Sequence, residues 1–262
     1  RDAMEKLWKA REKQLEKVLL NPAHIKGSIE GIAGNDSVDL HLLAAADEIP
    51  EYSIFYMHTT AVNTIIFDLG AVLVDWNPRH LYRKIFPSEE AMETFLRDVC
   101  SSDWNEAQDE GRTLAEGTAL LVAQFPHHEE NIRAYYGRWK EMLAGEIEGT
   151  AHILQALKSS GQYKLYALTN WSGETFPIAL PICPSLQLFD GIVVSGHEKL
   201  RKPDPAFYQL LLDRYNVNAS TALFIDDNAR NVKAAREFGI DSILFENPEQ
   251  LKIELNKRSI LI

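Results

Sequence analysis

The sequence predicts an α/β fold in which a parallel five-stranded sheet carries helices on both faces and an all-helical cap domain is inserted after the first strand. Short apolar segments alternate with helical patterns along the C-terminal half of the 262-residue chain, which is typical of a parallel sheet with crossover helices. The interval between the first two predicted strands is far longer than one crossover needs, and its patterns are helical. These two observations define the core and the cap.

The first predicted strand, 64–67, is a run of β-branched and aromatic residues that ends at Asp68, with Gly70 two positions later. Such a run suits a strand that is buried on both faces of a sheet. In open parallel sheets, ligands bind at the carboxyl ends of the strands, so Asp68 is a candidate nucleophile or metal ligand. The alternative interpretation is a strand-end aspartate that caps the next segment.

Four more strands are predicted at 164–168, 191–194, 221–225 and 241–244, with helices near 173–180, 204–215, 229–238 and 248–257. Between the first two strands, helical patterns lie at 78–86, 89–99, 113–125 and 129–143. We therefore assign residues 57–76 and 150–262 to a three-layer, Rossmann-like core and residues 77–149 to the cap. A cap above the strand ends would exclude water from a site there and select the substrate.

The segment before the first strand has a different pattern. Apolar residues recur at helical spacing over residues 1–20, and Gly, Asn, Asp and Pro interrupt the pattern from there to residue 56. We expect residues 1–56 to be an appended, helical N-terminal extension without chemistry of its own. The alternative is a helix that binds a partner or forms a dimer.

Composition excludes several classes of function. The net charge of −11 at pH 7 argues against a nucleic-acid-binding surface. No apolar run approaches the roughly 18 residues that a membrane-spanning helix requires. Cys100 and Cys183 have no metal-ligand spacing and are typical of a reduced chain. We expect a cytoplasmic protein, monomeric or homodimeric, that binds neither nucleic acid nor membrane.

Polar residues follow two further predicted strands. Thr169 and Asn170 can donate hydrogen bonds to an anion, although such residues are also common in turns and caps. Pro203 holds the residue before it in an extended conformation, so Lys202 can aim its ammonium group at a carboxylate and an anionic substrate. The alternative for Lys202 is a solvated basic loop.

Asp226 and Asp227 follow the fourth predicted strand. Adjacent carboxylates repel each other unless a cation binds between them, and oxygen ligands favour Mg²⁺. The alternative is an N-cap for the next helix, which one aspartate with Asn228 would satisfy. Because the carboxyl ends of parallel strands lie at one edge of a sheet, we expect the residues of all these segments to converge.

This ordered set of motifs resembles the haloacid dehalogenase-like hydrolase superfamily. The resemblance covers about residues 57–257 and is greatest for phosphatase-like members with a helical cap between the first two motifs. The stretches that resemble that subgroup are 75–82, 104–105 with 108–109, and 168–172.

The resemblance implies an Mg²⁺-dependent phosphatase that acts on a small phosphorylated metabolite, such as a sugar phosphate. Asp68 would attack phosphorus, and water would hydrolyse the resulting aspartyl-phosphate. Mg²⁺ would bind the Asp68 carboxylate, the backbone carbonyl of Gly70 and Asp227, with Asp226 beside it.

The remaining motif residues would hold the phosphate group. By the same resemblance, Thr169 and the backbone of Asn170 would bind phosphate oxygens, and Lys202 would bridge nucleophile and phosphate. Asn231 would support the metal shell.

Position 70 departs from the family pattern. Most phosphatases of the superfamily have a second aspartate there, which protonates the leaving group and then activates water. Gly70 lacks that acid–base group, which is commonly worth about 10²–10⁴-fold in rate. Asp75 or a cap residue such as His80 is a candidate replacement.

The same gap keeps two other functions open. A halide leaves without a proton, so one alternative is a metal-independent 2-haloacid dehalogenase that uses an aspartyl-ester intermediate. The other is a catalytically weak phosphate-binding relative. The presence of both Asp226 and Asp227 favours Mg²⁺ and phosphate.

Overall fold

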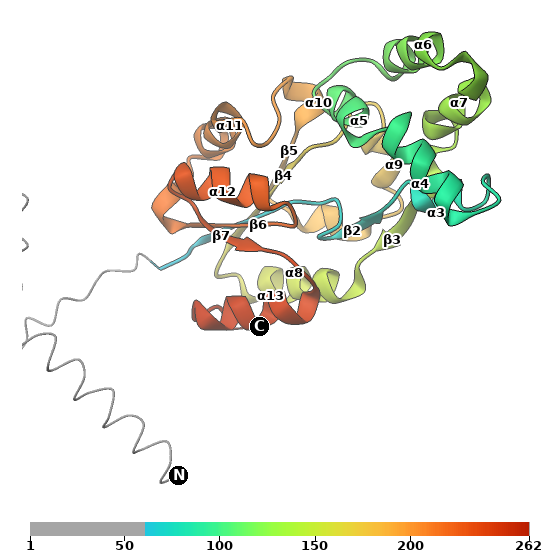
Figure 1. The fold of residues 1–262 in the computed structure, drawn as a ribbon. Helices are drawn as coiled ribbons and strands as arrows, with labels where there is room; N and C mark the ends of the chain where they lie inside the picture. The colour runs from blue at the N-terminus through green and yellow to red at the C-terminus, as the bar shows by residue number, and fades with distance from the viewer. Residues whose placement is uncertain (1–60, 262) are drawn as a thin grey trace, which may run out of the picture. The chain divides into compact units, whose positions relative to one another are not determined.

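The computed structural model describes residues 61–261, which contain a parallel five-stranded sheet in the order β5-β4-β1-β6-β7. Its strands are β1 (Thr64–Phe67), β4 (Lys164–Thr169), β5 (Gly191–Val194), β6 (Ala222–Asp226) and β7 (Asp241–Leu244). All neighbouring pairs are parallel, so the carboxyl ends of the strands share one edge (Figure 1). The predicted fold class is confirmed. The predicted extension, 1–56, lies outside the described residues.

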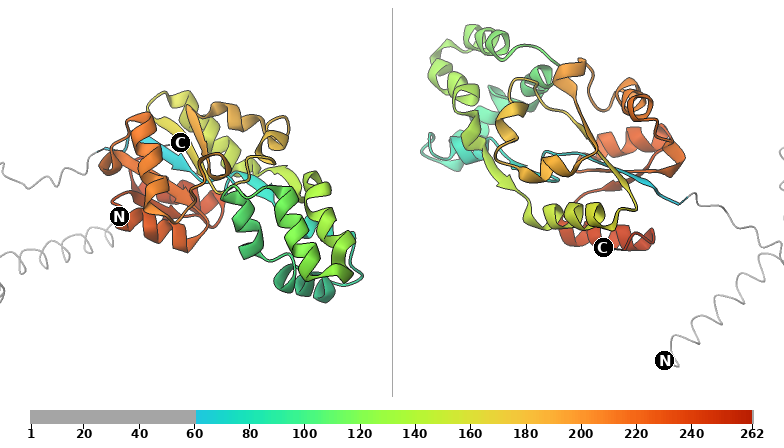
Figure 2. Two further views of the ribbon diagram at one scale, coloured as in Figure 1. Left: turned by 90° about the horizontal axis from the view of Figure 1, so that it is seen from above. Right: turned by 180° about the vertical axis from the view of Figure 1, so that it is seen from behind.

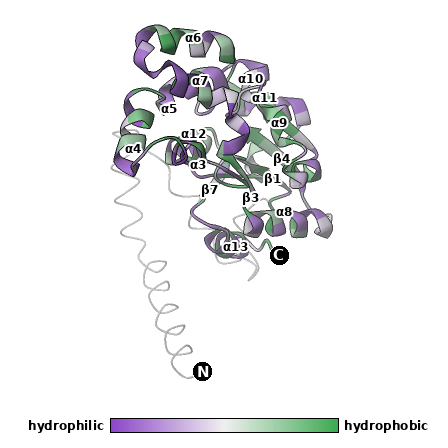
Figure 3. Cartoon of the chain, turned by 90° about the vertical axis from the view of Figure 1, so that its right-hand side faces the viewer, coloured by the Kyte–Doolittle hydropathy of each residue, from purple (hydrophilic) through white to green (hydrophobic). Residues whose placement is uncertain are grey.

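Helices cover both faces of this sheet (Figure 1). One face carries α8 (Glu148–Ser160) and α13 (Pro248–Lys257), and the other carries α11 (Pro205–Tyr215) and α12 (Ala229–Glu237). The alternation of side chains along β1 produces this division. Ile65 and Phe67 belong to the apolar cluster on the α8 side, whereas Ile66 belongs to the cluster on the α11 side. Figure 3 shows the apolar strands between helices whose outer faces are polar.

The inserted cap lies beyond one end of the sheet in every view (Figures 1 and 2). Its helices are α3 (Arg79–Tyr82), α4 (Glu89–Asp98), α5 (Ser102–Asp109), α6 (Leu114–Gln124) and α7 (Glu129–Gly137). Aromatic side chains form much of its interior. The rings of Tyr82 and Phe95 lie 5.0 Å apart, as do those of Trp104 and Tyr135, which are separations typical of interacting aromatic pairs.

Two short strands join the cap to the core, so the insertion is not helical throughout. β2 (Val74–Trp76) pairs antiparallel with β3 (Leu143–Glu146). The predicted helix over 129–143 is therefore too long, because α7 ends at Gly137 and a 3₁₀ turn over Trp139–Met142 leads into β3. β2 and β3 are short and mix apolar with polar residues or glycine, so no continuous apolar run marks them in the sequence.

Three helices of the described residues are absent from the predicted set: α5, α8 and the four-residue α10 (Ser195–Glu198). α5 is polar, and Gln108 is its one buried side chain, so no apolar stripe marks it. Ser101 caps it by accepting a hydrogen bond from the Trp104 N–H at 3.3 Å. In α8, buried Ala151, Leu154 and Leu157 do recur at helical spacing.

Two further features belong to the described residues. Across residues 61–261, no helix combines the length and the apolarity that crossing a bilayer requires. Cys100 and Cys183 are buried and free.

Candidate active site

The carboxyl ends of β1 and β6 bring three carboxylates together. Phe67 pairs in register with Ile225, and the Asp68 N–H donates a hydrogen bond to the Ile225 carbonyl at 2.8 Å, which places Asp68 beside Asp226. One carboxylate oxygen from each of Asp68, Asp226 and Asp227 lies within 4.8 Å of the others. Asp226 is fully buried and Asp227 is exposed. The cluster therefore opens outward from the sheet.

Lys202 lies against this carboxylate cluster. Its Nζ is 2.9 Å from Asp68 Oδ1 and 2.7 Å from Asp226 Oδ2, and its side chain is fully buried. Burial alone would lower the pKa of Lys202, but the negative charges of Asp226 and Asp68 outweigh it and raise that pKa. Lys202 is therefore a buried ammonium group and not a solvated loop lysine.

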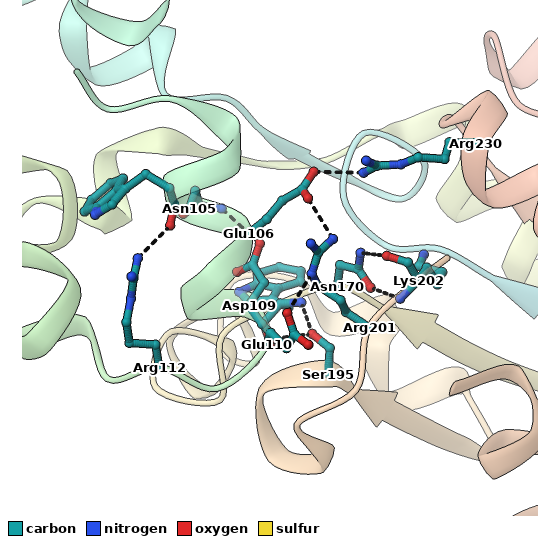
Figure 4. A network of polar contacts seen from close by, with 12 residues as sticks. Asn105, Glu106, Asp109, Glu110, Arg112, Asn170, Ser195, Arg201, Lys202 and Arg230 are labelled. Atoms are coloured by element: carbon teal, nitrogen blue, oxygen red, sulfur yellow. Dashed lines mark hydrogen bonds and ion pairs between the residues drawn. The ribbon is translucent and has the colours of Figure 1, made fainter. Parts of the chain in front are cut away.

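Asn170 fixes the backbone from which Lys202 projects (Figure 4). The Lys202 N–H donates to Asn170 Oδ1 at 2.8 Å, and Asn170 Nδ2 donates to the Lys202 carbonyl at 2.9 Å. These two hydrogen bonds occupy the side-chain amide of Asn170. The predicted contact between Asn170 and a phosphate oxygen would therefore be made by its backbone N–H.

Burial, together with repulsion within the cluster, raises the pKa values of Asp68 and Asp227. Burial raises the pKa of Asp68 to about 7; Lys202 opposes the shift, and Asp226 and Asp227 add to it. Burial and the charge of Asp226 also raise the pKa of Asp227. The ammonium of Lys202 thus leaves part of the negative charge uncompensated. A divalent cation would complete the compensation, and a set of carboxylate oxygens suits Mg²⁺.

Two buried polar atoms beside the cluster also fit a ligand. In the described part of the chain, Thr169 Oγ1 and Asn231 Oδ1 are buried and have no hydrogen-bond partner, which is costly unless something binds there. Asn231 Nδ2 donates to both Asp226 oxygens at 3.1 Å, so its own oxygen is left to accept. The Thr169 hydroxyl can donate to an anion.

Capping does not explain the acidic pair. Asn228 caps α12 by accepting a hydrogen bond from the Arg230 N–H at 3.0 Å. Asp226 Oδ1 accepts from the Asn228 N–H at 2.8 Å, and Asp227 has no role in the cap. Asp227 is therefore available as a ligand.

A cavity of about 720 Å³ lies between the core and the cap. Asp68, Gly70, Asn170 and Asp227 line it from the core, and Asp109 lines it from α5. A smaller pocket of about 50 Å³ adjoins it and has mixed aromatic and polar walls, formed by Gly70, Trp76, Asn105, Asp109, Tyr136, Trp139, Asn170, Trp171, Ser172 and Thr175.

Helix α5 is attached to the core around this cavity (Figure 4). Glu106 on α5 accepts from Arg201 at 2.7 Å and from Arg230 at 2.9 Å, both of which belong to the core. The Ser195 hydroxyl donates to the Asp109 carbonyl at 2.5 Å. These contacts hold the cap closed on the strand ends.

Asp109 is an acidic cap residue that lines both cavities; the resemblance of 108–109 to the phosphatase-like subgroup predicts no role for it. Asn105 Nδ2 donates to its Oδ2 at 2.9 Å. Burial raises its pKa to about 8, against the lowering effect of a hydrogen bond from the Ser172 backbone. The residues considered from sequence, Asp75 and His80, instead bond to each other at 2.9 Å. Neither is among the described residues that line the two cavities.

Comparison with known proteins places this geometry in context. The sequence model of the haloacid dehalogenase-like hydrolase family matches residues 62–239. A sesquiterpene phosphatase of Aspergillus oryzae is 28% identical over 181 residues, covering 69% of this chain and 88% of the relative. A drimenol cyclase of Aspergillus calidoustus is also 28% identical, over 74% of this chain, but the match spans 36% of that longer protein.

Solved structures share the fold. A HAD family enzyme of Bacteroides thetaiotaomicron, solved with magnesium and inorganic phosphate, superposes with a TM-score of 0.55 at 22% identity, covering 71% of this chain and 96% of that one. The L-2-haloacid dehalogenase of Xanthobacter autotrophicus superposes with a TM-score of 0.52 at 16% identity, covering 77% and 85%. Phosphatases and dehalogenases are therefore both among the similar proteins.

Proposed function

This chain belongs to the haloacid dehalogenase-like hydrolase family, and from that premise we propose that it is an Mg²⁺-dependent phosphatase acting on a small phosphorylated metabolite. One observation carries the choice: Asp68, Asp226 and Asp227 cluster within 4.8 Å. A metal-independent dehalogenase needs the nucleophile but gains nothing from further uncompensated carboxylates beside it. A cation site next to a phosphate-binding nucleophile needs them.

In the proposed reaction, an Asp68 oxygen attacks phosphorus in line and forms an aspartyl-phosphate as the ester bond breaks. Lys202 and the Thr169 hydroxyl hold phosphate oxygens and offset the charge that develops on them. Mg²⁺ would be held by Asp68, the Gly70 carbonyl and Asp227, with Asp226 beside them. Its charge would allow the Asp68 carboxylate and the substrate phosphate, both anions, to approach each other. Water then attacks phosphorus, which releases phosphate and restores Asp68.

The smaller pocket suits a small substrate that has both apolar and hydroxyl groups. Its aromatic walls include Trp76, Trp139 and Trp171, and Asn105 and Ser172 add polar groups. Aromatic faces with nearby hydrogen-bonding groups suit a sugar phosphate. The apolar walls and the similarity to a sesquiterpene phosphatase make a prenyl phosphate the competing class.

A phosphate-release assay tests the proposal. Sugar phosphates and prenyl phosphates are offered to the purified chain with Mg²⁺ and with EDTA, and Asp68→Asn is compared with Asp98→Asn. Asp98 is an exposed cap aspartate paired with Arg97 at 2.7 Å, so its replacement controls for loss of a carboxylate elsewhere. We expect Mg²⁺-dependent release that Asp68→Asn abolishes and Asp98→Asn retains.

Two other results would decide against phosphatase activity. Chloride release from 2-chloropropionate in the presence of EDTA would identify a dehalogenase. Tight binding of inorganic phosphate without turnover of any ester would identify a phosphate-binding relative.

A further inference from the structure

We propose that Asp109, on cap helix α5, is the acid–base residue of the phosphatase reaction and takes the role that no side chain at position 70 can fill. The inference rests on the proposed function and adds to it a catalytic group from the cap. An alkoxide leaving group needs a proton. In the proposed reaction Asp68 is the nucleophile, Asp226 and Asp227 belong to the cation site and Lys202 binds phosphate, so none of them is assigned that task.

Position supports this assignment. Asp109 and Gly70 line the same two cavities, Asp109 from the cap and Gly70 from the loop after β1. The Asp109 carboxyl is fixed from both domains, by the Asn105 side chain at 2.9 Å and by the Ser172 backbone N–H. A carboxyl held in this way keeps one orientation toward the cavity.

The structure leaves room for a side chain at position 70. A Cβ added at Gly70 would meet no atom within 4 Å, and the residue of this turn with a positive φ is Ala71, at 56°. Neither close packing nor backbone conformation therefore requires glycine at position 70. Position 70 can therefore accept an aspartate. A variant that combines Gly70→Asp with Asp109→Asn would move the acid from the cap to the core and so test the proposal directly.

The surroundings of Asp109 favour its protonated form at neutral pH. Burial raises its pKa to about 8; the Ser172 backbone and Arg201 oppose the shift, and Glu106 and Asp68 add to it. Tyr135 and Tyr136, on α7, also interact with its charge and are neutral at this pH, since their own pKa values are raised. A general acid must hold its proton at the working pH and have a pKa near it.

The proton balance of the reaction is then complete. As the Asp68 oxygen bonds to phosphorus and the ester P–O bond breaks, the leaving oxygen takes the proton of the Asp109 carboxyl and departs as the alcohol. In the second step the Asp109 carboxylate takes a proton from water while the water oxygen attacks phosphorus. The P–O bond to Asp68 breaks, phosphate leaves, and Asp109 is protonated again.

The experiment compares two substrates that differ in their need for an acid. p-Nitrophenyl phosphate releases a stable phenolate without help, whereas an alkyl ester such as a hexose 6-phosphate needs a proton. For Asp109→Asn we expect kcat/KM for the alkyl ester to fall by about 10²–10⁴-fold, and kcat/KM for the aryl ester to stay within about tenfold. Asp103→Asn, at an exposed site in the same helix, should leave both substrates unchanged.

A rescue variant separates catalysis from cap anchoring. Gly70→Asp in the Asp109→Asn background should restore alkyl-ester hydrolysis by at least about tenfold, because it places an acid at the same cavity. In the wild-type enzyme, kcat/KM for the alkyl ester should fall as pH rises through about 8, the pKa of Asp109. This arm requires no variant to fold.

Each other outcome overturns the inference in an identifiable way. Equal losses for both esters without rescue by Gly70→Asp would mean that Asp109 only anchors the cap. An alkyl-ester rate that does not decline through this pH range would also exclude it. If the wild type hydrolyses neither ester, the proposed function itself fails and the inference fails with it.

Discussion

Replacement of Lys202 by Met, which keeps an unbranched side chain one atom shorter, should strongly destabilise the metal-free fold. Lys202 Nζ lies 2.9 Å from Asp68 and 2.7 Å from Asp226. At an effective dielectric constant of about 20, each contact corresponds to about 6 kcal/mol of attraction, most of which desolvation of the charges offsets. Removal of one partner leaves the other charges buried and uncompensated, which costs about 3–5 kcal/mol. That is a large part of the roughly 5–15 kcal/mol by which a domain is stable.

Urea unfolding in EDTA at neutral pH measures this loss. Without Lys202, which lowers it, the folded-state pKa of Asp68 lies further above its unfolded value than the roughly 7 of the wild type. The stability deficit is therefore largest above the folded pKa and shrinks as pH falls and the carboxylates take up protons. Mg²⁺ should shrink it as well, because it supplies the missing positive charge.

A surface lysine provides the matched control. Lys233 is exposed and lies 3.7 Å from Glu237, so Lys233→Met should change stability by less than about 0.5 kcal/mol. A Lys202→Met deficit below about 1 kcal/mol, or one that is the same at neutral pH and near pH 5, would refute the reasoning because it would show that the cluster is not desolvated.

Three further predictions concern the same site. Thr169→Val should not lower the stability of the ligand-free fold, because the buried hydroxyl has no partner within the described residues. It should weaken phosphate-ester binding about tenfold or more, whereas Thr169→Ser should retain that binding; steady-state kinetics measure both. Glu106→Gln should lower the melting temperature by about 2–4 °C, as expected for about 1 kcal/mol, and speed hydrogen exchange in α5, because its charge attracts Arg201 at 2.7 Å. Mg²⁺ should raise the melting temperature of the wild type by mass action, and Asp227→Asn should remove most of that shift.

The proposed roles divide the site between the two domains. The core presents Asp68 and Lys202 at the strand ends, and the cap carries Asp109 on α5. Because Glu106 holds α5 on the core, closure of the cap and delivery of the acid would be one event. This explains why a site without an acid at position 70 would still need its cap.

Much of the core could be predicted because its signals are local. Four of the five strands of the sheet, β1, β4, β5 and β6, are short apolar runs that end in a polar residue or run directly into one. The predicted bounds agree with β1, β5 and β7 and differ by one residue at β4 and β6. Parallel pairing then requires the strand ends to meet, so the approach of Lys202 to Asp68 and Asp226 could be anticipated from the order of the motifs. The roles of these residues stay predictions until they are tested.

The cap could be predicted only in outline. β2 and β3 are held by pairing between segments about 70 residues apart, which no local pattern encodes. α5 is polar because it lies over the mouth of the site and carries Glu106 and Asp109 toward the core. The helix that carries the proposed acid therefore has no apolar stripe by which its sequence would reveal it.

The sequence by itself determined the α/β class, the inserted cap and the set of polar residues at the strand ends, because hydrophobic periodicity and turn residues act over a few neighbouring positions. Only the tertiary structure decided what surrounds them: that Lys202 is buried between two carboxylates, that Asn228 and not the acidic pair caps α12, and that Asp109 lines the same cavities as Gly70. Burial and cross-domain contact depend on residues far apart in the chain, and those properties set the pKa values and the chemistry of the site.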